Sequence, residues 1–246
     1  MREQPDQQAP PVQRLRIRYA KRGRLRFTSH RDFSRAFERA LVRAGIPMAY
    51  SSGFNPHPRI SYAGAAPTGS ASEAEYLEIG LAHETEPAEV HELLDTALPP
   101  GLDVVEVVVS AGGSIADRLE ASLWRITLPG VATEAARGAV TAFLDTEEVL
   151  VERMTKRGVR SFDCRAAVVS LSVADIPPSE GECAILEVVL RHGTPSVRPD
   201  DVLAGVREAS GLDLGSAALF ERVAQGPLDE QAGTVGDPLR PDRDAV

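Results

Sequence analysis

The sequence contains few of the residues that build metal sites or disulfide frameworks. Its two cysteines, Cys164 and Cys183, are far apart in 246 residues and form no CxxC pair. This argues against a zinc ribbon, an iron–sulfur site or a disulfide scaffold, and reduced thiols are expected. No P-loop, dinucleotide fingerprint, GxSxG elbow or HExxH helix occurs either. The chain therefore lacks the usual sequence signatures of most nucleotide-dependent and hydrolytic enzymes. We expect no cofactor and no metal.

Long apolar runs are also absent. No run approaches the roughly 20 residues that a membrane helix needs. The first residues, MREQPDQQAPPVQ, lack the apolar core of a signal peptide. We therefore expect a cytoplasmic protein without a membrane partner, long enough for one large domain or two small ones.

Positive charge is concentrated in one segment of an acidic chain. Residues 14–62 hold 12 of the 27 lysines and arginines but only two acids, whereas the whole chain has a formal charge of −9. A local surplus of this size indicates a site for an anion, such as a nucleic-acid backbone or an acidic partner. The alternative is a solvated arginine-rich surface.

The order of apolar patterns predicts an α+β protein with two tandem ferredoxin-like (βαββαβ) domains. Each would have an antiparallel sheet with two helices on one face and an open second face. We expect a disordered N-terminus over 1–12, domain 1 with the basic segment over 13–110 and a linker over 111–121. Domain 2 is expected over 122–225 and a flexible tail over 226–246.

The first predicted strand and helix carry most of the positive charge. Residues 14–27 alternate, which predicts a strand with Leu15 and Ile17 facing the helices and Arg16 and Arg18 on the open face. Ser29 is expected to cap the helix that follows. Arginines recur on this helix at successive i, i+4 spacing and form a basic ridge: Arg31, Arg35, Arg39 and Arg43. Arg24 adds a further positive charge before the helix begins. Guanidinium groups bind phosphate bidentately, so the pattern suits phosphates along a strand.

A stiff loop, SSGFNPHPRIS, is the second candidate site. Pro56 and Pro58 fix the backbone on either side of His57, so the loop can present Asn55, His57 and Arg59 in a fixed geometry. The simpler alternative is a rigid entry into a strand.

Two histidines leave a catalytic alternative open. His30 begins the basic helix, where the helix dipole favours the neutral imidazole that can act as a base. His30 and His57 would form one site if the loop folded back over the start of the helix. Their separation does not follow from the sequence.

The run KRGRLRFTSHRDFSRAFERALVRAGIPMAYSSGFNPHPRISYAGAAPTGSASEAEYLEIGL closely resembles the radical-SAM-linked family, whose domain is of unknown function. The resemblance covers residues 15–82 closely and 120–225 more loosely. Members usually read SHLD where this chain reads SHRD, which keeps His30 and Asp32 and adds Arg31. Members occur as separate proteins or fused behind a radical SAM protein, which implies a radical SAM partner. Their genes tend to neighbour those for ribonuclease E/G and ribosomal proteins, which implies a role with RNA.

Together these features predict an accessory protein that binds RNA, either tRNA or rRNA. It would present this RNA to a separately encoded radical SAM enzyme. The predicted phosphate and RNA contacts are Arg16, Arg18, Arg24, Arg31, Arg35, Arg39, Asn55, His57 and Arg59. One alternative is a metal-independent endoribonuclease with His30 or His57 as general base or acid. Another is a protein-interaction module that binds no RNA.

Overall fold

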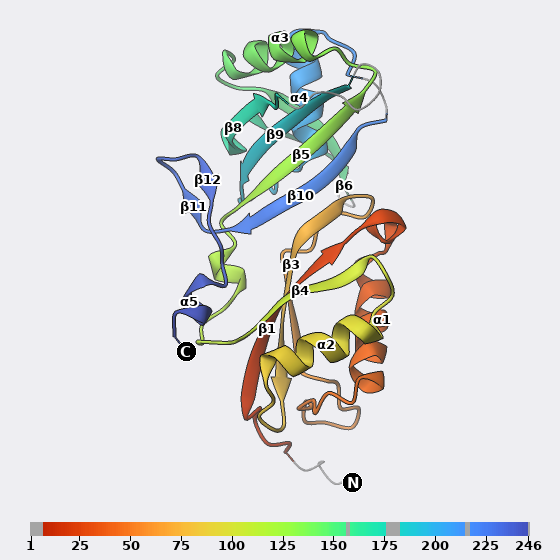
Figure 1. The fold of residues 1–246 in the computed structure, drawn as a ribbon. Helices are drawn as coiled ribbons and strands as arrows, with labels where there is room; N and C mark the ends of the chain where they lie inside the picture. The colour runs from red at the N-terminus through yellow and green to blue at the C-terminus, as the bar shows by residue number, and fades with distance from the viewer. Residues whose placement is uncertain (1–6, 156–157, 176–182, 215–216, 246) are drawn as a thin grey trace. The chain divides into compact units, whose positions relative to one another are not determined.

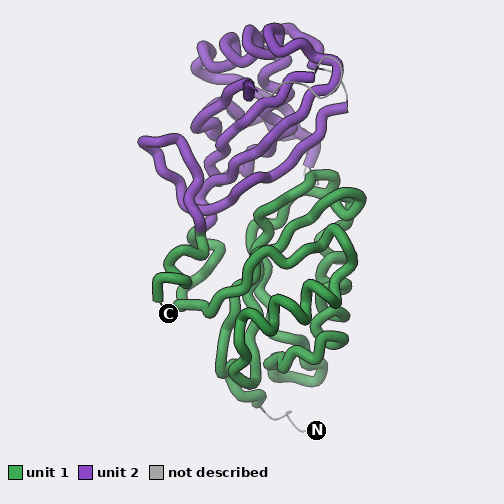
Figure 2. The backbone as a smooth tube through the Cα atoms, in the orientation of Figure 1, with its two compact units in different colours: residues 1–118, 238–246 green, residues 119–237 purple. Residues whose placement is uncertain are grey.

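The chain folds into two compact units in the computed structural model, which describes residues 7–155, 158–175, 183–214 and 217–245. Unit 1 comprises residues 1–118 and 238–246, and unit 2 comprises residues 119–237 (Figure 2). Unit 2 is therefore inserted into unit 1 in sequence. Both units mix helices with antiparallel sheets, so the expected α+β class is confirmed. Of the N-terminus expected to be disordered, residues 1–6 lie outside the described part.

Unit 1 is built around a sheet in the order β4-β1-β3, with β2 paired to β3 and all pairs antiparallel (Figure 1). Its elements are β1 (Gln13–Lys21), the 3₁₀ segment η1 (Gly23–Phe27), α1 (His30–Arg43), β2 (Ile60–Ala63), β3 (Ala71–Leu81), α2 (Pro87–Ala97), β4 (Leu102–Val109), η2 (Ala116–Arg118) and α5 (Arg240–Arg243).

Alternation along β1 divides the two faces of this sheet as the sequence predicts. Leu15, Ile17 and Tyr19 are buried in one core cluster with the apolar faces of α1 and α2. The strand is shorter than expected. It stops at Lys21, and Gly23 takes a φ of 54°, a backbone conformation that favours glycine, as the chain turns into η1.

Arg16 lies on the opposite face of the sheet but is fully buried, with a relative exposure of 0%. Its Nη1 donates to both carboxylate oxygens of Asp242, at 2.7 and 2.8 Å, and its Nε donates to Glu78 at 3.1 Å. Its Nη2 donates to the carbonyl oxygens of Gly112 and Gly113, at 2.8 and 2.7 Å. The expectation of an open-face Arg16 that binds phosphate is therefore wrong, because protein acceptors surround its guanidinium.

Asp242 is the second centre of this buried network. It also accepts a hydrogen bond from Arg118 Nη1 at 2.7 Å and one from the backbone N–H of Ala111 at 2.8 Å. Burial alone would raise the pKa of Asp242, but the hydrogen bonds from Arg16, Ala111 and Arg118 outweigh it and lower the pKa below its usual value. The carboxylate therefore stays ionised inside the protein.

Unit 2 has a four-stranded antiparallel sheet in the order β10-β5-β9-β8. Its elements are β5 (Ala121–Pro129), α3 (Thr133–Leu144), β6 (Leu150–Thr155), β7 (Gly158–Asp163), the 3₁₀ segment η3 (Arg165–Ala167), β8 (Val168–Val173), β9 (Cys183–Arg191), α4 (Pro199–Ser210), β10 (Leu219–Gly226), β11 (Leu228–Asp229) and β12 (Thr234–Val235). Strands β6 and β7 pair with each other in a separate antiparallel hairpin.

Residues 226–245 differ from the expected flexible tail. They contain the β11–β12 pair, which belongs to unit 2, and α5, which belongs to unit 1. Leu239 and Asp242 are both fully buried. The polar, turn-rich composition of this segment suggested flexibility, but one apolar and one charged anchor hold it in place.

Helix α4 packs closely over a buried cysteine of unit 2. A Cβ added at Gly205 would lie 2.5 Å from Cys164 Sγ and 3.0 Å from Phe143 Cε2, so glycine is needed for this approach. Burial, aided by the nearby Asp163, raises the pKa of the Cys164 thiol to about 12. Cys164 is thus a neutral core residue, and both cysteines are free thiols.

The Arg16–Asp242 network predicts that Asp242→Ala lowers the free energy of unfolding by about 3–5 kcal/mol, because a buried guanidinium loses its main partner. Asp244→Ala is the control, since Asp244 pairs with Arg240 at the surface and should change stability by less than about 1 kcal/mol. Urea unfolding of the three proteins measures this. Equal stability of wild type and Asp242→Ala would contradict it.

The lowered pKa of Asp242 also determines how the stability of the protein changes with pH. Its contribution to stability is complete above the ordinary pKa of 3.8 and is lost as the pH falls through the lower folded value. Wild type should therefore lose stability below about pH 4 more steeply than Asp242→Asn does. Parallel stability profiles for the two proteins would count against the assignment.

The close approach at Gly205 predicts that Gly205→Ala destabilises the protein by about 1–3 kcal/mol through overpacking. Gly138→Ala is the matched control. Gly138 lies inside α3 with no atom within 4 Å of an added Cβ, so alanine there should stabilise by about 0.5–1 kcal/mol. Adding Cys164→Ala should recover part of the loss at Gly205. Thermal unfolding tests all three, and a neutral Gly205→Ala would refute the packing argument.

Candidate anion-binding surface

The arginines on the strands of unit 1 are already paired with acceptors. Arg14 donates to Glu78 at 3.0 Å, and Arg22 bonds Glu73 and Asp103. The hydrogen bond to Glu73 is the main reason that the pKa of Arg22 is raised above its usual value. Protein acceptors thus neutralise much of the positive charge that the sequence concentrates here.

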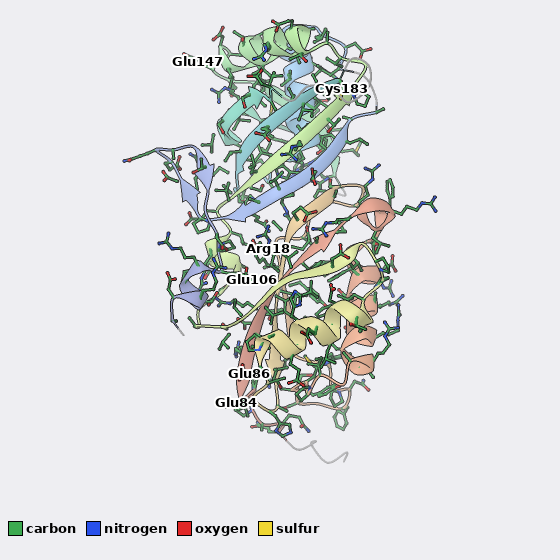
Figure 3. All side chains as sticks on the ribbon, viewed as in Figure 1. Arg18, Glu84, Glu86, Glu106, Glu147 and Cys183 are labelled. Carbon is green, nitrogen blue, oxygen red and sulfur yellow. The ribbon has the colours of Figure 1, made fainter. Side chains whose placement is uncertain are left out.

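Arg18 is half-buried on β1, and its Nε donates to the backbone carbonyl of Glu73 at 2.8 Å. In the antiparallel register its partner on β4 is Glu106, and both residues are labelled in Figure 3. Glu106 in turn accepts a hydrogen bond from Arg243 at 2.6 Å. Arg18 is therefore less accessible to a phosphate than the exposed arginines among the predicted contacts.

Helix α1 presents the opposite situation. Phe33, Phe37, Ala40 and Leu41 are buried, which turns the other side of the helix outward. The helix starts at Ser29, whose hydroxyl accepts the backbone N–H of Asp32 at 3.2 Å and donates to the Asp32 carboxylate at 2.7 Å. Capping and amphipathicity together fix which side chains face the solvent.

The solvent side of α1 carries the arginine ridge, defined as Arg31, Arg35, Arg39 and Arg43, and all four are exposed. Arg43 donates to the carbonyl oxygen of Ala97. For Arg31, Arg35 and Arg39, no side-chain hydrogen bond or ion pair occurs with any residue that the structure describes. These three guanidinium groups are free to bind an external anion.

A shallow hollow of about 720 Å³ lies along the arginine ridge from Arg35 to Arg43. Its lining comprises Arg35, Glu38, Arg39, Val42 and Arg43. Glu38 lies among the arginines without an ion pair in the described part of the chain, so cations outnumber acids three to one in this lining. Arg24, exposed in η1, also has no partner among the described side chains.

Hydrogen bonds between Ser51 and His57 close the loop over residues 51–59. The Ser51 N–H donates to the His57 carbonyl at 2.8 Å, and the His57 N–H donates to Ser51 Oγ at 3.0 Å. Arg59 is half-buried and donates from Nε to the Tyr50 carbonyl at 3.1 Å. Asn55 and His57 are exposed on this fixed loop.

The two histidines have different surroundings. The His30 ring meets the edge of the Tyr62 ring at a centroid distance of 4.9 Å, beside Ser34. Burial raises the pKa of Tyr62, whose hydroxyl lacks a well-formed hydrogen bond in the described residues. His57 instead lines a pocket of about 260 Å³ with Arg14 and Glu78. No described contact joins the two imidazoles.

Over the described ranges, no three His, Cys, Asp or Glu side chains come together in a way that would hold a metal ion. Within the same ranges, none of the helices combines the length and apolar character that crossing a bilayer requires.

Sequence reasoning missed one exposed aromatic beside the basic residues. Phe27 is 60% exposed, and the Arg26 guanidinium lies over its ring at 4.8 Å from the centroid. Alternation through residues 14–27 suggested a continuous strand and concealed this position. The glycine at position 23 was the available signal that the strand ends before Phe27.

Comparisons with known proteins give a family match and a likeness to solved structures. A family model described as "uncharacterized protein conserved in bacteria (DUF2344)" matches residues 14–199, which is most of the chain. That description names no radical SAM partner. No curated protein sequence matches the chain. One similar solved structure is a chain in the crystal structure of a Cbf5-Nop10-Gar1 complex, at 12% identity and a TM-score of 0.47. It covers 91% of this chain but only 55% of that one, and at this score it supports no inference.

Proposed function

We propose that this chain, which belongs to the conserved bacterial family DUF2344, is an accessory RNA-binding protein that uses the arginine ridge of α1 as its phosphate-binding surface. The observation that carries the proposal is the contrast between two groups of arginines. Those on the strands are paired with protein acceptors, whereas Arg31, Arg35 and Arg39 have no partner among the described side chains.

The spacing of the arginine ridge favours a repeating anion over a single one. Successive members are four residues apart, which is about 6 Å along a helix axis. A hollow that runs along the helix, instead of closing around one ligand, fits an extended chain of phosphates. Arginine binds each phosphate through a planar fork of N–H donors, and the local charge governs contact even though the whole chain is acidic.

The choice of RNA, and of a radical SAM enzyme as partner, comes from the resemblance of residues 15–82 to the radical-SAM-linked family. In this proposal the chain holds tRNA or rRNA while a separately encoded enzyme carries out the chemistry. Asn55 and His57 would add polar contacts from their fixed loop, and Arg24 and Arg59 would add charge. Arg18 has no part in this surface, because it points away from the sheet face that packs against α1.

We further infer that each unit is a ferredoxin-like βαββαβ repeat. Support comes from strand order: β4-β1-β3-β2 in unit 1 and β10-β5-β9-β8 in unit 2 place corresponding strands in the same positions, with every neighbouring pair antiparallel. The hairpin β6–β7 is then an insertion in the second repeat.

Replacing Arg31, Arg35 and Arg39 together with Gln should weaken binding of short single-stranded RNA at least about tenfold, since three charge-assisted contacts are lost. The slope of log K against log salt should become shallower by about 2, at roughly 0.7 per contact. The matched control replaces Arg137, Arg191 and Arg240, which removes the same charge from surface ion pairs elsewhere. Filter binding across a salt series measures both variants.

Two results would overturn the proposal. One is unchanged affinity in the variant of the arginine ridge. The other is an equal loss in the control, which would mean that net charge alone governs binding. Discrete cuts in wild-type RNA that vanish in His30→Ala or His57→Ala would instead favour the endoribonuclease alternative.

A further inference from the structure

We infer that Phe27, together with Arg26, forms a stacking platform for an unpaired base at the start of the arginine ridge, so that the ligand is single-stranded and not duplex RNA. This inference rests on the proposed function and specifies its substrate. It depends on a side chain that the phosphate contacts do not use. Phe27 is 60% exposed, and one cation already covers part of its ring.

The position of Phe27 is fixed by the backbone around it. The Thr28 N–H donates to the Leu25 carbonyl at 2.9 Å, and the Gly69 N–H donates to the Arg26 carbonyl at 2.8 Å. Leu25 packs against the core of unit 1. Because η1 is anchored through Leu25, the exposure of Phe27 belongs to the folded state and does not come from a loose loop.

The surroundings of Phe27 are cationic. Residues three apart in a 3₁₀ segment lie one above the other, which places Arg24 on the same side of η1 as Phe27. Arg31, the first member of the arginine ridge, follows Phe27 by four residues, and no acid occurs between Arg22 and Arg31. An apolar ring among unpaired guanidinium groups suits a ligand that carries both negative charge and flat aromatic surface.

Single-stranded RNA has this combination. Its bases stack on aromatic side chains and on guanidinium planes, while its phosphates follow a basic groove. Duplex RNA keeps its bases stacked inside the helix and offers an exposed ring nothing to stack on. An acidic protein partner would supply carboxylates without the flat rings, so it fits the charge but not Phe27.

The test compares oligoadenylate, an RNA duplex of equal length and inorganic polyphosphate as probes of the full chain. Wild type should bind oligoadenylate more tightly than duplex or polyphosphate. Phe27→Leu should weaken binding of oligoadenylate about five- to hundredfold and leave polyphosphate unaffected, whereas Phe27→Tyr should bind like wild type. Leu150→Ala is the control, because Leu150 is an apolar side chain that is 56% exposed and lies outside the residues proposed to contact RNA.

The outcomes separate this inference from the proposed function. RNA binding that depends on the arginine ridge but is unchanged in Phe27→Leu would overturn the stacking platform and leave the phosphate-binding surface intact. The same holds if duplex or polyphosphate binds as tightly as oligoadenylate, or if Leu150→Ala loses as much affinity. Absence of any RNA binding by wild type would overturn both.

Discussion

A guanidinium removed from water must be surrounded by acceptors, and Arg16 imposes this requirement on one face of unit 1. The acceptors come from three places in the sequence: Glu78 on β3, the carbonyls of Gly112 and Gly113, and Asp242 on α5. Glu78, Gly112 and Asp242 each accept a hydrogen bond from a second arginine as well, so the segments that carry them are fixed together. The ordered path of residues 110–118 and 238–245 follows from satisfying one buried charge.

The same use of acids determines which cations remain accessible. Glu73, Glu78, Asp103 and Asp242 are committed to arginines of β1, of the turn after it and of η2. The hollow beside the arginine ridge is lined by a single acid, Glu38, and that carboxylate forms no ion pair in the described residues. A chain of net charge −9 can thus carry a positive surface, because many of its acids form ion pairs with other arginines or lie outside this part of the sequence.

Local patterns in the sequence predicted the features that local physics controls. Alternation placed Leu15 and Ile17 in the core, and Ser29 identified the start of α1, whose helical spacing put Arg31, Arg35 and Arg39 on one side. Alternation could not distinguish a face open to solvent from a face covered by a distant segment. Arg16 and Arg18 have the same strand position in the pattern, yet only Arg16 meets Asp242, which is 226 residues away in sequence. No local signal marks such a partner.

The insertion of unit 2 into unit 1 has a consequence for how the chain is made. Arg16 leaves the ribosome 226 residues before Asp242, a delay of roughly 10–45 s at ordinary rates of synthesis. During that interval the whole of unit 2, which is continuous over residues 119–237, is synthesised, while Arg16 in the sheet of unit 1 still lacks its Asp242 partner. Unit 1 therefore receives the last of its buried charged residues only after the whole sequence of unit 2 has been made.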